Sequence, residues 1–130
     1  MAARRPRRSP RQPRARARAE VVVALSTAPS EEVAVTLARA LVDEHLIACA
    51  NLLPRARSIY RWQGAVQDEV EVVLVMKTTA STVPALKRRL DALHPYETPE
   101  MLVIPVASGL GPYLDWVVAE TTGPARPRRV

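Results

Sequence analysis

Apolar and polar positions along the chain change their period several times, and each period predicts an element. The clearest pattern is at residues 66–78, where apolar side chains take every second position, as in a strand with one buried face. A β-branched run at 21–25 predicts a short buried strand, and residues 101–107 predict another. Residues 46–62 also have an extended pattern, but Pro54 interrupts it, so we expect a kinked or bulged strand there.

Three segments show the helical period of about 3.6 residues instead. A first helix over 30–45 opens on a serine, a good N-cap residue, followed by two glutamates. A second helix begins at Ser81 or Thr82 and ends at His94, because the proline that follows disfavours helical geometry at the residue before it. A short third helix is expected over 112–121, with its aromatic residues on one side.

The order of these elements, β-α-β-β-α-β plus a final helix, predicts the ferredoxin-like fold. This is an α+β fold in which helices cover one face of an antiparallel sheet. The second and third strands form one hairpin around a tight turn at Gln63-Gly64. The second strand has about 16 residues and a length of about 50 Å, whereas a domain of this size is only about 35 Å across. The hairpin must overhang its domain, and its exposed edges predict a homo-oligomer.

The net charge of +6 is distributed unevenly along the chain. Residues 1–19 contain eight Arg and no acid, residues 123–130 contain three Arg, and residues 20–122 carry a net charge of −5. We interpret the chain as one acidic domain, 20–122, between a disordered Arg/Pro-rich tail and a basic C-terminal tail. An Arg-rich tail can bind nucleic acid or another polyanion. The N-terminal tail has no aromatic residue for base stacking, which favours an extension without that role.

The remaining composition argues against several classes of protein. The longest apolar runs are five residues, whereas a membrane-spanning helix needs about 20, and the N-terminus has no apolar stretch typical of a secretory signal. A single cysteine allows no internal disulfide, so the cytoplasm is the expected compartment. The sequence has no G-x-S-x-G, H-E-x-x-H, Walker or G-x-G-x-x-G motif. It therefore predicts a protein without membrane contact that is not an enzyme.

Few residues carry candidate chemistry. Cys49 and His94 are of the types that Cu²⁺ and Zn²⁺ favour, but neither belongs to a motif with metal-binding spacing. Cys49 is also explained as a small buried core residue, and His94 as a helix terminator whose imidazole bonds the last carbonyls. As a nucleophile and a base, the two lack a third group that would orient them.

The segment at 94–100, HPYETPE, is more unusual because two prolines stiffen a stretch that holds an imidazole, a phenol and two carboxylates. Rigid polar loops of this kind tend to bind ligands, although a well-capped connection between a helix and a strand is the alternative. Lys77 and Glu71 lie on the same face of the strand at 66–78. They are either a solvated ion pair or the charged wall of a pocket.

Several stretches together resemble the CutA divalent-cation tolerance family, and the resemblance covers residues 21–120. They are ACAN at 48–51, SIYRWQG at 58–64, KT at 77–78, HPYETPE at 94–100, Gly109 and YLDW at 113–116. The family implies a ferredoxin-like fold assembled as a homotrimer, in which the long hairpins pack against neighbouring subunits. It also implies a role in the tolerance of copper and other divalent cations, and an architecture similar to that of the PII signalling proteins.

Carried over to this sequence, the family's positions imply two sets of site residues. The candidate ligands of a divalent cation, Cu²⁺ or Zn²⁺, are Cys49, His94, Glu97 and Glu100. The residues implied around a cleft between subunits are Tyr60, Trp62, Lys77, Tyr96 and Trp116. Some relatives carry a cysteine where this chain has Ser26 and a histidine where it has Leu93, so those two ligands are missing here.

Our first hypothesis is a cytoplasmic homotrimer that responds to divalent metal ions by binding them, without catalysis and without an organic cofactor. The alternative is a PII-like sensor that binds a small anionic metabolite in the cleft between subunits, because Lys77 would supply a cation beside aromatic residues. Binding of a polyanion through the Arg-rich tail is the third and least favoured hypothesis.

Overall fold

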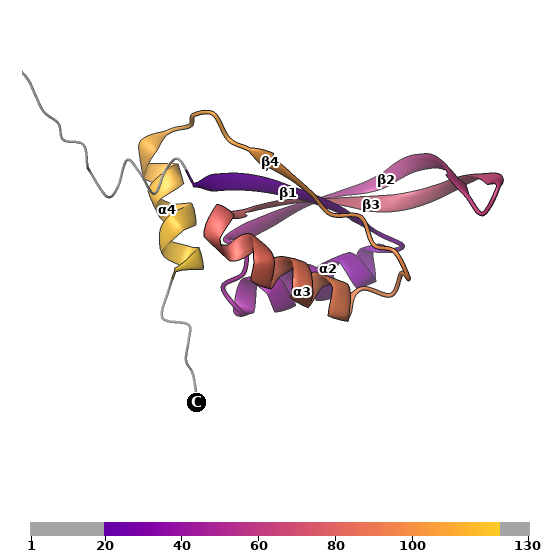
Figure 1. Cartoon of the computed structure of the whole chain (residues 1–130), viewed down its shortest axis with the longest axis horizontal. Helices are drawn as coiled ribbons and strands as arrows, with labels where there is room; N and C mark the ends of the chain where they lie inside the picture. The colour runs from indigo at the N-terminus through magenta and orange to yellow at the C-terminus, as the bar shows by residue number, and fades with distance from the viewer. Residues whose placement is uncertain (1–19, 123–130) are drawn as a thin grey trace, which may run out of the picture.

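The computed structural model describes residues 20–122, which form a four-stranded antiparallel sheet with two helices on one face and a third helix at one end (Figure 1). The predictions for residues 1–19 and 123–130 lie outside the described residues. The strand order β2-β3-β1-β4 confirms the predicted ferredoxin-like fold. In chain order the elements are β1 (Val21–Ala28), α2 (Glu31–Asp43), β2 (Cys49–Trp62), β3 (Ala65–Thr79), the 3-10 turn η3 (Ala80–Thr82), α3 (Val83–Leu93), β4 (Leu102–Pro105) and α4 (Gly111–Thr121).

The element boundaries differ from the predicted ones where strand pairing or a turn outweighs the local pattern. β1 continues beyond its predicted end, because residues 26–28 also pair with β3. β2 begins at Cys49 rather than at residue 46, and α2 ends at Asp43 rather than at residue 45. Between these two elements, His45 takes a left-handed conformation with φ of 60°, which ends the helix and redirects the chain.

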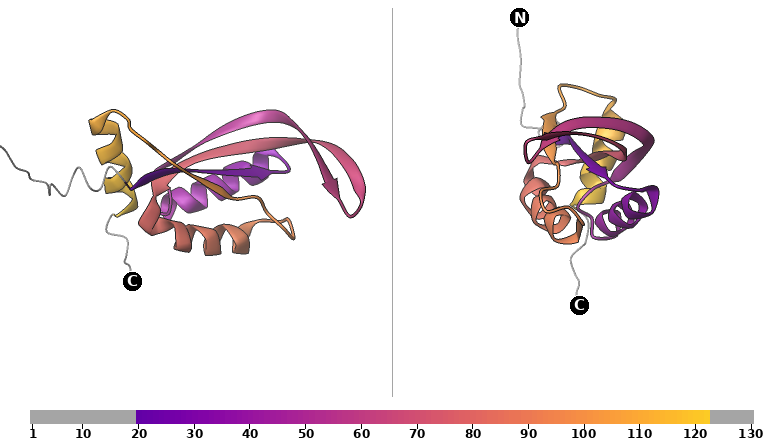
Figure 2. Two further views of the ribbon diagram at one scale, coloured as in Figure 1. Left: turned by 45° about the horizontal axis from the view of Figure 1, so that its top comes forward. Right: turned by 90° about the vertical axis from the view of Figure 1, so that its right-hand side faces the viewer.

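Helices α2 and α3 cover the same face of the sheet, and the main core lies between them and the strands (Figure 2). Ser30 caps α2 as predicted, since its hydroxyl accepts a hydrogen bond of 3.2 Å from the backbone N–H of Val33. Alternate residues of β1 and β3 point into this core, among them Ala24, Ala28, Leu74 and Met76. We call the other face of the sheet the open face.

β2 and β3 form the predicted long hairpin, which extends beyond the rest of the domain (Figures 1 and 2). Both residues of its turn, Gln63 and Gly64, have positive φ (51° and 83°), the backbone that suits a two-residue hairpin. The irregularity predicted at Pro54 is confirmed, because the pairing register shifts around it and Arg55 adopts φ of 62°. The projecting part exposes large apolar side chains, including Ile59, Val66 and Val70.

Helix α4 packs at one end of the sheet, where Leu114 and Val117 form a second apolar cluster with Val21 and Ala48. Its bounds agree with the predicted helix to within one residue. This helix brings its aromatic residues to the end of the sheet where β2 begins. None of the helices in residues 20–122 is long and apolar enough to cross a membrane.

Candidate functional site

The predicted site residues separate into two groups that lie toward opposite ends of the open face. One group lines a cavity of about 730 Å³, which we call the acidic pocket. Its lining residues come from β1, the hairpin and the loop after α3, and are Thr27, Ser58, Ile59, Tyr60, Trp62, Glu71, Pro95, Tyr96, Glu97, Thr98 and Glu100. The other group, which we call the lysine cluster, lies beside α4 and consists of Cys49, Asn51, Lys77 and Tyr113.

Two pairs of a phenol and a carboxylate lie at the acidic pocket. Tyr96 donates a hydrogen bond of 2.6 Å to Oε2 of Glu71, whose side chain is buried. Tyr60 donates one of 2.7 Å to Oε1 of Glu69, the preceding carboxylate on the same face of β3. Burial and then the bond to Glu71 raise the pKa of Tyr96 well above its usual value, and the bond to Glu69 raises the pKa of Tyr60. Both phenols therefore remain protonated donors at neutral pH.

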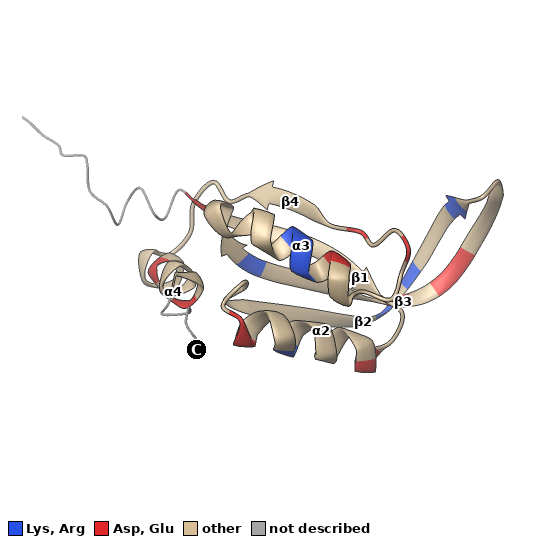
Figure 3. Ribbon diagram, turned by 60° about the horizontal axis from the view of Figure 1, so that its bottom comes forward, with Lys and Arg blue, Asp and Glu red and all other residues tan. Residues whose placement is uncertain are grey.

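The ionisable groups of the pocket other than its phenols are carboxylates. Figure 3 shows acidic residues on the projecting part of β3 and on the loop that precedes β4. These two segments supply the carboxylates of the lining, Glu71 from the strand and Glu97 and Glu100 from the loop. None of the lining residues is Lys, Arg or His.

Buried polar side chains hold the loop that forms one wall of the pocket. Nε2 of His94 lies 2.7 Å from the carbonyl oxygen of Thr27, and Nδ1 accepts the backbone N–H of Tyr96 at 3.1 Å. A proton on Nε2 satisfies both contacts. The hydroxyl of Ser26, which is fully buried, donates a hydrogen bond of 2.8 Å to the carbonyl oxygen of Glu100. The loop is therefore fixed to β1 at both of its ends.

His94 ends α3 as predicted, because its backbone is extended (φ −77°, ψ 140°). The predicted contact of its imidazole with the last helix carbonyls is wrong. The ring instead reaches the carbonyl of Thr27 at the end of β1, because the loop turns back across the sheet directly after the helix.

At the other end of the open face, Cys49 lies near both a cation and a phenol. Its Sγ is 3.7 Å from Nζ of Lys77 and 3.5 Å from the hydroxyl oxygen of Tyr113. Lys77 also donates to Oδ1 of Asn51, and the ring of Tyr113 packs against Trp116 with centroids 5.6 Å apart. The hydrogen bond with Cys49, followed by burial, raises the pKa of Tyr113 to about 12. Cys49 is half-buried, so its interpretation as a fully buried core residue is wrong.

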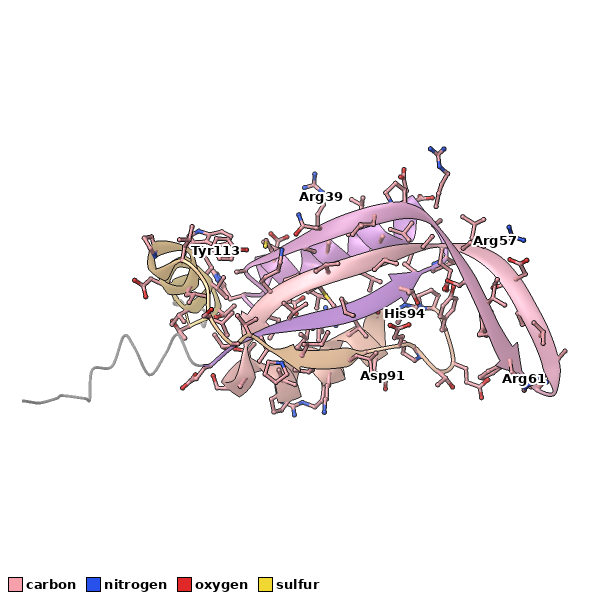
Figure 4. The ribbon with its side chains drawn as sticks, turned by 90° about the horizontal axis from the view of Figure 1, so that it is seen from above. Arg39, Arg57, Arg61, Asp91, His94 and Tyr113 are labelled. Atoms are coloured by element: carbon pink, nitrogen blue, oxygen red, sulfur yellow. The ribbon has the colours of Figure 1, made fainter. Side chains whose placement is uncertain are left out.

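The four predicted metal ligands do not come together within one chain. Through Lys77, Cys49 is aligned with Val23 of β1, whereas His94 bonds Thr27, four residues or about 13 Å further along that strand. Figure 4 shows the same separation between His94 and Tyr113, the phenol beside Cys49. Both ring nitrogens of His94 are also engaged by the backbone. Among residues 20–122, no three His, Cys, Asp or Glu side chains are grouped to hold a metal ion, so one chain does not fit the Cys/His site.

The predicted cleft residues are divided in the same way. Tyr60, Trp62 and Tyr96 line the acidic pocket together with the candidate ligands Glu97 and Glu100. The other two, Lys77 and Trp116, belong to or adjoin the lysine cluster. The cation and most of the aromatic residues expected in one cleft are therefore at different ends of this chain.

The sequence analysis did not identify the partners of these residues. Glu71 is buried against Tyr96 while Lys77 bonds Asn51, so the alternative of a solvated pair is wrong and Glu71 is the charged wall of a pocket. No local signal connects Glu71 with a tyrosine 25 positions away. Tyr113 had such a signal, because it was expected on the same side of its helix as Trp116.

Comparison with known proteins identifies the family. Residues 22–120 match the family described as CutA1 divalent ion tolerance protein. The chain is 54% identical over 101 residues to the divalent-cation tolerance protein CutA of Thermus thermophilus, which covers 78% of this chain and 97% of that protein. The crystal structure of CutA from Xylella fastidiosa has a TM-score of 0.77 at 43% identity, covering 78% of this chain and 98% of that one. The periplasmic divalent cation tolerance protein CutA of Archaeoglobus fulgidus has a TM-score of 0.75 at 31% identity, with the same coverage of 78% and 98%. This chain belongs to the CutA1 divalent ion tolerance family.

Proposed function

We propose that the protein acts in divalent-cation tolerance by binding a cation without catalysis, and that the acidic pocket is the binding site. The observation that carries this proposal is the charge of the lining. Glu71, Glu97 and Glu100 contribute carboxylates, and none of the lining residues is Lys, Arg or His. A partly enclosed cavity strengthens the attraction between these carboxylates and a cation, because less water screens it than at an open surface.

A cation bound in this pocket would keep part of its water shell. No three His, Cys, Asp or Glu side chains of the described part of the chain are grouped to coordinate an ion directly. Proteins often hold hydrated divalent ions through one or two carboxylates. Cu²⁺ and Zn²⁺, the ions that the resemblance implies, are the first to test, and we expect their binding to depend on Glu97 and Glu100 more than on Cys49.

Binding, rather than catalysis, is supported by the separation of Cys49 from His94, the pair considered as nucleophile and base. The acidic lining also disfavours the alternative hypothesis of an anionic metabolite in this pocket, because like charges repel. Lys77, the residue that motivated that alternative, bonds Asn51 in the lysine cluster instead.

Isothermal titration of Cu²⁺ and Zn²⁺ into the full chain at neutral pH tests the cation proposal. We expect one saturable site per chain, and about ten-fold weaker binding or more in the double variant Glu97→Gln/Glu100→Gln, which removes two carboxylates at nearly constant volume. Glu120→Gln, which changes an exposed carboxylate on α4, is the matched control and should bind like the parent. Unchanged affinity in the double variant, or loss of binding in Cys49→Ser, would overturn the pocket as the site.

We further propose that the protein is a homotrimer. The projecting hairpin and β4 expose apolar side chains that a monomer would leave in water, including Ile59, Val70, Leu102 and Ile104. β2 and β4 are also the two edges of the sheet, where further strands can pair. Light scattering during size-exclusion chromatography should give three times the chain mass of 14.3 kDa, and Val70→Asp should reduce it. A monomeric parent protein would contradict this proposal.

We propose the cytoplasm as the compartment, because the single cysteine gives no sign of an oxidising environment. The relative from Archaeoglobus fulgidus is described as periplasmic, so relatives differ or the two proteins occupy different compartments. Fractionation of cells that express the full chain tests this proposal. Recovery of the protein in a fraction outside the cytoplasm would overturn it.

A further inference from the structure

We infer that the acidic pocket binds an aliphatic polyamine, which is an organic cation with more than one ammonium group. This inference goes beyond the proposed function because it concerns a second class of ligand and requires no metal ion. It rests on three properties of one cavity: aromatic side chains, carboxylates from separate segments, and a lining without basic residues.

The aromatic side chains and the size of the cavity indicate an organic ligand. Tyr60 and Trp62 line it from the same face of β2, and Tyr96 lines it from the loop after α3. Aromatic faces attract ammonium groups, and Trp attracts them most strongly. The volume of about 730 Å³ lies within the range of about 300–1,000 Å³ that is typical of sites for small organic molecules. A methylene chain would have apolar surface to contact there.

Glu71 supplies a buried carboxylate that no basic side chain neutralises. Its side chain is 7% exposed, and its hydrogen bond in the described residues is the one that Oε2 accepts from Tyr96. Neither of the two ion pairs in residues 20–122 involves Glu71. Because a buried carboxylate without a cation is costly, an ammonium group that donates to Oε1 relieves this cost.

The other carboxylates favour a ligand with more than one charge. Glu97 and Glu100 belong to the loop, on the opposite side of the lining from Glu71 on β3. A metal ion needs several oxygen atoms that converge on one point, and no such group exists among residues 20–122. A flexible carbon chain instead carries its ammonium groups to carboxylates that lie apart. Separate carboxylates therefore fit a polyamine better than a single bare ion.

The wall that carries these groups is held before any ligand arrives. His94 and Ser26 fix the two ends of the loop to β1 through the contacts with Thr27, Tyr96 and Glu100. Pro95 and Pro99 restrict its backbone further. Because little ordering remains to be done on binding, a larger share of the interaction contributes to affinity.

Calorimetric titration of spermidine into the full chain tests the inference, with Trp62→Leu, Glu71→Gln and Trp116→Leu as variants. Trp62 and Trp116 are equally exposed, at 41% each, but only Trp62 lines the pocket. We expect saturable binding that Trp62→Leu and Glu71→Gln each weaken about ten-fold or more, while Trp116→Leu binds like the parent. Spermidine should also change the fluorescence of Trp62 in the Trp116→Leu variant. Absence of saturable binding, or equal affinity in all variants, would overturn the inference.

Two further titrations separate this inference from its neighbours. Tetramethylammonium carries one charge and no N–H group, so it should bind at least ten-fold more weakly than spermidine; equal binding would overturn the assignment of a polyamine. Zn²⁺ is titrated separately into the same proteins. Binding of Zn²⁺ without spermidine overturns only this inference, whereas binding of spermidine without Zn²⁺ or Cu²⁺ supports it and overturns the proposed cation function.

Discussion

The two ends of the open face use the same pair of strands and present opposite chemistry. The acidic pocket combines carboxylates with phenols, whereas the lysine cluster combines an ammonium group with a thiol and an amide. Glu71 and Lys77 lie on one face of β3, six positions or about 20 Å apart. Charges at that distance are largely screened, since the Debye length at physiological ionic strength is about 8 Å. A shared strand face therefore does not make a shared site.

The two ends also differ in how they are built. In the lysine cluster, Cys49 and Lys77 are direct partners in adjacent strands, so the sheet itself brings them together. In the acidic pocket, the wall is a loop that depends on contacts over long sequence distances, such as the bond between His94 and Thr27. Removal of single side chains should therefore damage the pocket more than the cluster.

Replacement of the two histidines should break this comparison most clearly. His94→Ala leaves two backbone groups without partners and opens a cavity, so we expect it to lower the free energy of unfolding by about 2–4 kcal/mol. His45, which lies at the α4 end and bonds the carbonyl of Glu120 at 2.9 Å, has positive φ. His45→Asn keeps a residue that tolerates this backbone and should cost less than about 1 kcal/mol. Urea unfolding measures both, and equal losses would contradict the comparison.

Substitution of the two charged residues on β3 should have the next largest effect. Glu71→Ala removes the acceptor of the Tyr96 hydroxyl and should destabilise the protein by about 1–3 kcal/mol. Lys77→Met keeps the aliphatic stem of a half-buried side chain and should cost less than about 1 kcal/mol. Glu71→Gln retains an acceptor and should recover most of the stability. A larger loss in Lys77→Met than in Glu71→Ala, by urea unfolding, would reverse the order of the two ends.

Local patterns predict the fold well, and the reason is visible in particular residues. The alternation at 66–78 predicts β3, and Ser30 and His94 mark the predicted start of α2 and end of α3. These signals depend on neighbours within a few positions. The end of β1 was predicted too early because pairing with β3 keeps residues 26–28 extended, and this contact is invisible in a local pattern.

The candidate site was predictable only in part. The loop at 94–100 was singled out by composition, and three of its residues, Tyr96, Glu97 and Glu100, do line the pocket. The grouping was not predictable from spacing, because it depends on the bulge near Pro54 and on the fold of the loop over β1. Those features decide that Glu71 meets Tyr96 while Lys77 does not.

The tyrosines at the two ends should respond differently to alkaline pH. A phenol with a raised folded-state pKa holds its proton more tightly when folded, so this stability is fully present below pH 10 and is lost as the pH rises through the folded value. We expect Tyr113 to ionise near pH 12 and Tyr96 to ionise above it, since burial and Glu71 act on Tyr96 together. Absorbance titration of Tyr113→Phe and Tyr96→Phe assigns the steps. Ionisation of Tyr96 before Tyr113 would contradict this order.

Substitution of Cys49 should have the smallest effect and give the sharpest test of independence between the ends. Cys49→Ala removes a half-buried thiol and should cost less than about 1 kcal/mol. The hydrogen bond with Cys49 is the largest cause of the raised pKa of Tyr113, so its ionisation should move from about 12 toward 10, while that of Tyr96 stays unchanged. Binding of Zn²⁺ and spermidine should also stay unchanged, because the thiol is outside the acidic pocket. If Cys49→Ala weakened Zn²⁺ binding about ten-fold, both ends would contribute to one site. Their separation within one chain would then require that site to form between copies of the protein.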